Sequence, residues 1–214
     1  MKRLICVLLL LGMILSLSAC GKTAAPQGIA RTQYEDISAA AVDTMKNAKA
    51  FSVGYSKVDI TPKSSVPLAG FGRSSERMSK NVLDNIYATA VALTDGEGNT
   101  VLWIALDLQR ANFALVEAVR PMIQAATGIP QDRIMFGGSH THSGPDVLAT
   151  SHPTIIEYLE YLYPLILQAA LEALADMKPA EMYYGSTMTE NMVFVRHYRM
   201  NDGSTYGNGH GTTA

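Results

Sequence analysis

The chain of 214 residues carries 17 lysines and arginines against 19 aspartates and glutamates, for a formal net charge of −2. This balance, together with 48% hydrophobic residues, excludes a basic nucleic-acid binder and an acidic disordered chain. A chain of this length buries roughly two-thirds of its unfolded surface on folding, so it needs no disulfide or metal to form a core. Because Cys6 and Cys20 are the only cysteines, any metal site further along must use His, carboxylate or Tyr ligands.

The N-terminal segment, MKRLICVLLLLGMILSLSAC, has the pattern of an export signal. Lys2 and Arg3 precede an apolar run at residues 4–17, and small residues follow it. The run is shorter than the about 20 apolar residues that span a bilayer. A cleaved signal peptide is therefore favoured over an uncleaved anchor helix.

The tetrapeptide Leu17-Ser18-Ala19-Cys20 at the end of this run resembles the bacterial lipobox. The resemblance implies cleavage before Cys20 and attachment of lipid to its thiol, which holds a protein on the membrane because acyl chains bury many methylenes. We expect residues 1–19 to be a lipoprotein signal peptide and the mature protein to be exported and membrane-anchored at the bacterial cell surface. Residues 20–50 are expected to be a lipidated tether and a short helix at residues 33–50, where apolar side chains recur at spacings of three and four.

From residue 51 the apolar pattern changes to a period of two, which predicts a strand. Val53 and Tyr55 follow this period and, after a slip in register, Val58 and Ile60 continue it. Two further runs, residues 85–93 and 100–108, are joined by turn-forming residues and predict a hairpin. The second run is apolar at every position from 101 to 106, so we expect a central strand covered on both faces.

Helices and strands alternate in the rest of the chain. Residues 111–127 predict a helix that ends at Gly128, and a strand centred on residues 134–136 follows. Residues 153–177 predict the longest helix, with Ile156 in its apolar stripe and a kink or interruption at Pro164.

Residues 182–185 and 192–198 are again strand-like, and no closing element follows them. The elements together predict the α/β class, a mixed sheet flanked by helices. We expect residues 51–214 to be the N-terminal part of a larger domain.

A polar loop with the sequence GGSHTHSGP follows the strand at residues 134–136. Open α/β sheets place their sites at this position, beyond the end of a buried strand. His140 and His142 stand two residues apart, so on an extended segment both imidazoles point to one side. Neutral imidazole is a common zinc ligand. The spacing alone leaves two interpretations open, a metal site and a pair of hydrogen-bonded loop histidines.

Two other polar residues follow apolar strands. Asp107 either caps the next helix or supports a histidine. Arg196 either reaches an anionic or carbonyl group or is simply solvated. The sequence contains no P-loop, no GxSxG elbow, no GxGxxG after a strand and no HExxH. The commonest nucleotide-binding, serine-hydrolase and metalloprotease interpretations are thereby removed.

Four blocks of the sequence resemble the N-terminal region of the neutral/alkaline, non-lysosomal ceramidases. The blocks are VDITPKSSVPLAGFG at residues 58–72, ALDL at 105–108, GGSHTHSGPD at 137–146 and FVRHYRMNDG at 194–203. Their order and spacing match from residue 53 to residue 203, and SHTHSGP is the most specific piece.

This resemblance implies a zinc-dependent amidase domain that cleaves the N-acyl bond of ceramide-like lipids to sphingosine and a fatty acid. In that family two His, one Glu and one Tyr hold the zinc, and the first His of the HTH string, here His140, is one of them. His142 would hydrogen-bond the substrate or the bound water. Arg196 would help to hold the substrate, although VRHY stands where the family usually has NRS. The remaining ligands would lie beyond residue 214.

Two interpretations from other classes compete with the enzyme. A cell-surface lipoprotein could bind lipid or glycan with the same fold and no chemistry. A metal-carrier lipoprotein would need a His- or Asp-rich loop or a second ligand cluster, and the sequence has neither.

Overall fold

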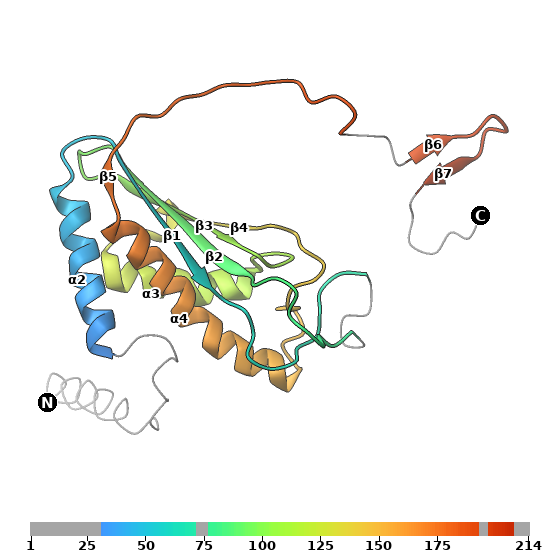
Figure 1. Cartoon of the computed structure of the whole chain (residues 1–214), viewed down its shortest axis with the longest axis horizontal. Coiled ribbons are helices and arrows are strands. Elements are labelled where there is room, and N and C mark those ends of the chain that lie inside the picture. The colour runs from blue at the N-terminus through green and yellow to red at the C-terminus, as the bar shows by residue number, and fades with distance from the viewer. Residues whose placement is uncertain (1–30, 72–76, 193–196, 208–214) are drawn as a thin grey trace, which may run out of the picture. The chain divides into compact units, whose positions relative to one another are not determined.

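A computed structural model of the chain describes residues 31–71, 77–192 and 197–207, which form parts of two compact units, residues 1–181 and 182–214. The first unit is built around a five-stranded sheet with the strand order β4-β3-β2-β1-β5 (Figure 1). Its strands are β1 (Ser52–Asp59), β2 (Tyr87–Thr94), β3 (Thr100–Leu106), β4 (Ile134–Gly138) and β5 (Lys178–Pro179). Only the β3–β4 pair is parallel, so the sheet is mixed as the sequence predicts.

Three helices lie on one side of this sheet: α2 (Arg31–Asn47), α3 (Phe113–Thr127) and α4 (Pro153–Ala175) (Figure 1). The helix α4 contacts β1, β2 and β3, and α2 and α3 pack against α4. A short 3-10 turn, η2 (Gln131–Arg133), leads from α3 into β4. The α/β class is confirmed, with the helices of the described residues gathered on a single face. None of the helices in the described part of the chain combines the length and apolarity needed to cross a membrane.

Small residues of β1 face the core. Ser52, Ser56, Val58 and Ile60 are buried on the helix side, whereas Tyr55 is 53% exposed. The predicted slip in register is therefore wrong, because alternation is regular from residue 52 to residue 60. A Cβ at Gly54 would collide with the backbone of α4 at Ala173, so glycine here allows the helix to approach the sheet closely.

The prediction that β3 is covered on both faces is also wrong for the described residues. Leu102, Ile104 and Leu106 are fully buried, but Trp103 on the opposite face is 56% exposed. The pairing register aligns Trp103 with Val91 on β2 and with Met135 on β4. An apolar run in β3 therefore supplies one face to the core and another to an uncovered apolar surface.

The helix boundaries follow local capping. Asn112 caps α3 by accepting a hydrogen bond from the Leu115 N–H at 2.8 Å, so the helix begins at Phe113 and not at residue 111. At the other end Gly128 adopts the predicted left-handed conformation and donates to the Gln124 carbonyl.

Pro164 lies inside the long helix α4 and does not interrupt it, and the alternative of a kink stays a prediction. The position of the buried stripe differs from the prediction. Ile156 is 48% exposed, because the buried stripe begins one residue earlier, at Ile155. Within this stripe Tyr158 is buried and its hydroxyl donates to the Ile60 carbonyl at 2.8 Å, which fixes the end of β1 against α4. Burial, reinforced by the neighbouring Tyr161, raises the pKa of the Tyr158 phenol far above its usual value.

The second unit contains a two-stranded antiparallel hairpin of β6 (His197–Arg199) and β7 (Thr205–Gly207). The Met200 N–H donates to the Ser204 carbonyl at 2.8 Å to close its turn. Residues 182–185 form no strand, which corrects the prediction, and Tyr183 and Tyr184 in this stretch are exposed.

Candidate functional site

The histidine loop, residues 139–145, begins where β4 ends, as the sequence predicts. Since β3 and β4 run parallel, their carboxyl ends meet at the same edge of the sheet. The Ser139 N–H donates to the Leu106 carbonyl at 3.0 Å, and the His140 N–H donates to the Leu108 carbonyl at 3.1 Å. The loop therefore extends the β3–β4 pairing and lies against residues 107–110.

Two glycines permit this close packing of backbones. A Cβ at Gly138 would lie 2.8 Å from the Cα of Arg110, and one at Gly144 would lie 3.0 Å from the Asp107 carbonyl oxygen. Gly137 plays no such part, because a Cβ there would meet only the Trp103 indole nitrogen at 3.7 Å.

The imidazole of His140 is held in a defined tautomer. Its Nδ1 lies 2.9 Å from the carbonyl oxygen of Gln109. A carbonyl oxygen can only accept, so Nδ1 carries the proton and donates. When the ring carries a single proton, the lone pair is therefore on Nε2, and the side chain is exposed. Metal-binding histidines are commonly oriented in this way by a carbonyl behind the ring.

The imidazole of His142 is surrounded by four neighbours. Its Nε2 lies 3.4 Å from the Nε2 of Gln109, its ring centroid lies 4.9 Å from that of Phe71, and 5.2 Å separate it from the His140 ring. On the remaining side the ring packs on the backbone of Gly70, where any Cβ would overlap it. The two histidines thus converge as predicted, although His140 has a φ of 62° and not the extended conformation that the spacing argument assumes.

Arg77 connects the segment at residues 69–71 to the histidine loop. Arg77 donates to the carbonyls of Ala69, Gly70 and His142 at 3.1, 2.9 and 3.1 Å. Its guanidinium also lies over the Phe71 ring, 4.9 Å from the centroid. The β1–β2 connection is thereby clamped to the histidine loop by charge-assisted hydrogen bonds.

Sequence reasoning missed these supporting residues. Gly70 and Phe71 lie within the block VDITPKSSVPLAGFG, which the resemblance singled out without giving them a role. Gln109 supports His140 through a backbone atom, and the hydrogen bonds of Arg77 all go to backbone carbonyls, so neither interaction can be recognised from the spacing of side chains.

Asp107 takes neither of the roles expected for it. Its carboxylate accepts a hydrogen bond from the Tyr87 N–H at 3.1 Å and so closes the end of the β2–β3 ladder. Asn112, not Asp107, caps α3. Arg196 and Cys20 lie outside the described residues.

The described residues contain no cluster of three or more His, Cys, Asp or Glu side chains able to hold a metal ion. His140 nevertheless has a donor type that zinc accepts, an imidazole with one nitrogen oriented by a carbonyl. The described part of the chain therefore supplies one oriented zinc donor, the His140 imidazole, and not a complete set of metal ligands.

Fold and loop together define an α/β protein with a paired-histidine loop at the carboxyl edge of its sheet. No protein-family model matches the sequence. The structure is similar to that of neutral ceramidase from Pseudomonas aeruginosa, with a TM-score of 0.54 and 20% identity over 61% of this chain and 22% of that one. It is equally similar to a ceramidase complexed with C2, with a TM-score of 0.53 and 19% identity over 61% of this chain and 22% of that one.

The chain therefore has a ceramidase-like fold. The match covers 22% of the length of each of these two proteins.

Proposed function

We propose that this chain belongs to a zinc-dependent amide hydrolase that cleaves the N-acyl bond of ceramide-like lipids. The observation that carries the proposal is the oriented imidazole of His140, 2.9 Å from the Gln109 carbonyl, on a loop beside a second imidazole. The ceramidase-like fold supports it. The motif SHTHSGP at residues 139–145 supports the assignment of roles.

In this proposal His140 would hold zinc through Nε2, with further ligands outside the described residues. Zinc, when bound, polarises a carbonyl and lowers the pKa of a ligated water. His142, in contact with Gln109 and Phe71, would place a ring nitrogen beside the reacting carbonyl oxygen and hydrogen-bond it. Arg196 would contribute a further hydrogen-bond donor, a cationic one, to the substrate.

The test uses the full-length gene product and two substitutions. His140→Ala should remove most of the zinc and all measurable turnover, because zinc is held in proteins by three or four ligands and each matters. His142→Ala should retain more zinc but lose about 10²- to 10³-fold in kcat, the usual cost of one donor to a developing oxyanion. Elemental analysis gives the zinc content, and release of fatty acid from a fluorescent ceramide gives turnover.

A His140→Ala protein with full zinc content and normal turnover would exclude the assignment. If the folded wild-type protein binds ceramide without hydrolysing it, the alternative of a lipid-binding lipoprotein replaces the enzyme. For the 214-residue chain alone we expect weak zinc binding and no turnover, since its described residues hold no complete ligand set.

We also propose that the protein is anchored to the bacterial membrane through lipid on Cys20. The support is the lipobox-like LSAC at residues 17–20 after an apolar run. Mass spectrometry of the mature N-terminus should show cleavage between Ala19 and Cys20 and an acylated cysteine. A Cys20→Ser protein that remained lipid-anchored would contradict the proposal.

A further inference from the structure

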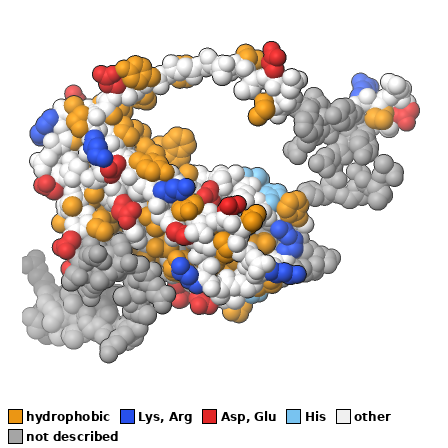
Figure 2. Space-filling view, in the orientation of Figure 1, with side chains coloured by type: hydrophobic (Ala, Val, Ile, Leu, Met, Phe, Trp, Pro, Cys, Tyr) orange, Lys and Arg blue, Asp and Glu red, His pale blue; other side chains and the backbone are white. Residues whose placement is uncertain are grey.

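Gln109 contacts both histidines of the loop, through two different groups. Its backbone carbonyl oxygen lies 2.9 Å from the Nδ1 of His140, and its side-chain Nε2 lies 3.4 Å from the Nε2 of His142. His140 is exposed and His142 is half-buried, and Figure 2 shows histidine side chains at the surface of the first unit. One residue of the segment that follows β3 therefore reaches a ring nitrogen of each histidine.

Arg110 determines which way the Gln109 amide faces. The Nη2 of Arg110 lies 3.3 Å from the Oε1 of Gln109. A guanidinium group can only donate, so the amide atom that faces it is the oxygen, and the amide NH₂ group faces His142. The reverse orientation would set the N–H groups of the amide against those of the guanidinium.

The direction of the Gln109 amide determines where the His142 ring carries its proton. An amide nitrogen can only donate, so the His142 Nε2 accepts. In a ring with a single proton, that proton is then on Nδ1. Within the described residues, neither the Nδ1 of His142 nor the Nε2 of His140 has a hydrogen-bond partner. His140 is thus left with a free lone pair, and His142 is left with a free N–H.

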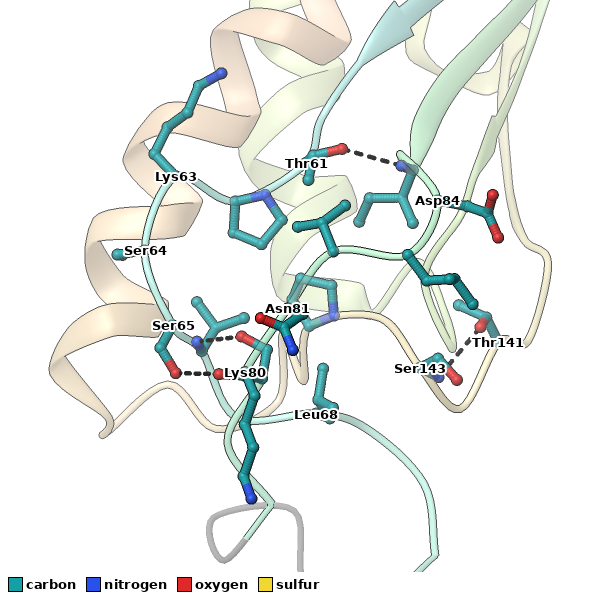
Figure 3. A pocket seen from close by; sticks show the side chains of 17 residues that line it. Thr61, Lys63, Ser64, Ser65, Leu68, Lys80, Asn81, Asp84, Thr141 and Ser143 are labelled. Atoms are coloured by element: carbon teal, nitrogen blue, oxygen red, sulfur yellow. Dashed lines mark hydrogen bonds between the residues drawn. The ribbon is translucent and has the colours of Figure 1, made fainter.

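The backbone of His142 is held by other residues. Arg77 donates to the His142 carbonyl at 3.1 Å. The Ser143 N–H donates to the Thr141 Oγ1 at 3.2 Å, and these two residues line a cleft that neither histidine lines (Figure 3). Because these bonds do not involve the imidazole nitrogens, a change in the Gln109 side chain should alter the His142 ring and leave the loop in place.

We propose that Gln109 is a positioning residue that sets the ring tautomers of both histidines, that of His140 through its backbone carbonyl and that of His142 through its side-chain amide. The use of these tautomers in catalysis rests on the proposed function, in which His140 offers a lone pair to zinc and His142 donates to the substrate through Nδ1–H. Since the contact with His140 uses a backbone atom, substitution of the Gln109 side chain should change His142 alone.

Nitrogen-15 NMR of the histidine rings in the 214-residue chain measures both tautomers, because protonated and unprotonated ring nitrogens resonate at well-separated frequencies. Spectra are recorded at about pH 9, where an ordinary imidazole with a pKa of about 6.5 carries one proton. Gln109→Leu removes the amide and keeps a side chain of similar size. Gln109→Glu replaces the donor by an acceptor.

The three proteins should differ in the His142 ratio of Nδ1–H to Nε2–H. The neutral bond in the wild type should raise this ratio by about two- to tenfold over Gln109→Leu, the range for one neutral hydrogen bond. In Gln109→Glu the carboxylate accepts from Nε2–H, so the ratio should fall about tenfold or more below that of Gln109→Leu. His140 should carry its proton on Nδ1 in all three proteins.

Gln124→Glu is the matched control. Gln124 is exposed on α3, and its Oε1 accepts a hydrogen bond from the Gln131 Nε2 at 2.8 Å. A carboxylate oxygen accepts the same bond, so this variant adds the same charge without the loss of a contact. Both histidine tautomers should be those of the wild type.

Equal His142 ratios in the wild type and Gln109→Leu, or Nδ1–H retained in Gln109→Glu, would overturn the proposal. So would a shift of the same size in Gln124→Glu. If Gln109→Glu does not fold, the comparison of the wild type with Gln109→Leu still decides. Turnover of ceramide by the full-length protein is scored separately. The expected tautomers without turnover support the role of Gln109 and remove the amidase, whereas turnover with equal ratios leaves the amidase and removes the role of Gln109.

Discussion

Two of the non-glycine residues with a left-handed backbone lie at the histidine loop and at the segment that contacts it. Among the described residues only Phe71, His140 and Asn191 combine a side chain with a positive φ, and two of these three lie at the site, with φ values of 56° and 62°. Such conformations cost free energy and persist where the surroundings enforce them. Here the Gln109 carbonyl fixes the His140 ring, and Arg77 fixes the segment that carries Phe71. This local cost supports a functional loop over a pair of chance histidines.

Replacement of Gly70 by alanine should disturb His142. Gly70 has a φ of 81°, and an added Cβ would overlap the imidazole. Gly70→Ala would therefore be destabilised both by backbone strain and by a steric clash with the ring. Gly98→Ala is the matched control, because its φ is 99° and nothing lies within 4 Å of its Cβ. We expect Gly70→Ala to lower the free energy of unfolding by roughly 2 kcal/mol more than the control does.

Urea unfolding measures the difference in stability, and the NMR resonances of the His142 ring report its displacement. Equal stabilities with unchanged His142 resonances would show that Gly70 does not position the ring. A ring shift only in Gly70→Ala would identify the β1–β2 connection as part of the site.

At the scale of elements, the spacing between β1 and α4 depends on Gly54. A Cβ there would overlap the Ala173 carbonyl and lie 2.8 Å from the Met177 nitrogen, both backbone atoms that cannot rotate away. Gly54→Ala should therefore destabilise the fold by about 3 kcal/mol or more, at the upper end of overpacking effects. Gly137→Ala in β4 should cost less than about 1 kcal/mol, since its nearest neighbour would be 3.7 Å away.

Thermal unfolding followed by circular dichroism compares the two variants. If Gly54→Ala were as stable as Gly137→Ala, close packing between β1 and α4 would not hold, and the contact between Tyr158 and Ile60 could not fix the end of β1 as described.

The elements that the sequence predicted are those specified by local signals. The β2–β3 hairpin has a turn between two apolar runs, α3 ends at a glycine, and β4 leads directly to the histidine loop. The orientation of β1 was missed because Gly54 and Ser56 face the core, and hydrophobic periodicity cannot register small residues.

The site was predicted in the same partial way. His140 and His142 were recognised from their spacing and from the resemblance. Their supports were not, because the Gln109 carbonyl and the Gly70 backbone carry no side-chain pattern and arrive through long-range contacts. The roles of Arg196 and Cys20 remain predictions that belong to residues outside those described.

In the described part of the first unit, helices cover one face of the sheet and leave the other face uncovered. The helices bury one face, and on the other the pairing register aligns Tyr55, Val91, Trp103 and Met135 across four strands. Three of the four are about half exposed, at 53%, 56% and 46% for Tyr55, Trp103 and Met135. Contiguous apolar surface of this kind is unusual on a soluble monomer and marks a face that another layer can cover.

Trp103 is the single tryptophan of the chain, so its fluorescence reports on this face alone. With the indole 56% exposed, the folded 214-residue chain should emit close to the wavelength of tryptophan in water and should be quenched efficiently by acrylamide. Unfolding in urea should then change the emission wavelength little. The same measurement across a dilution series shows whether a second copy covers the face, because association would shift the emission to the blue at high concentration. A blue-shifted, poorly quenched signal that persists on dilution would mean that residues of this same chain cover Trp103, and the uncovered face described here would be wrong.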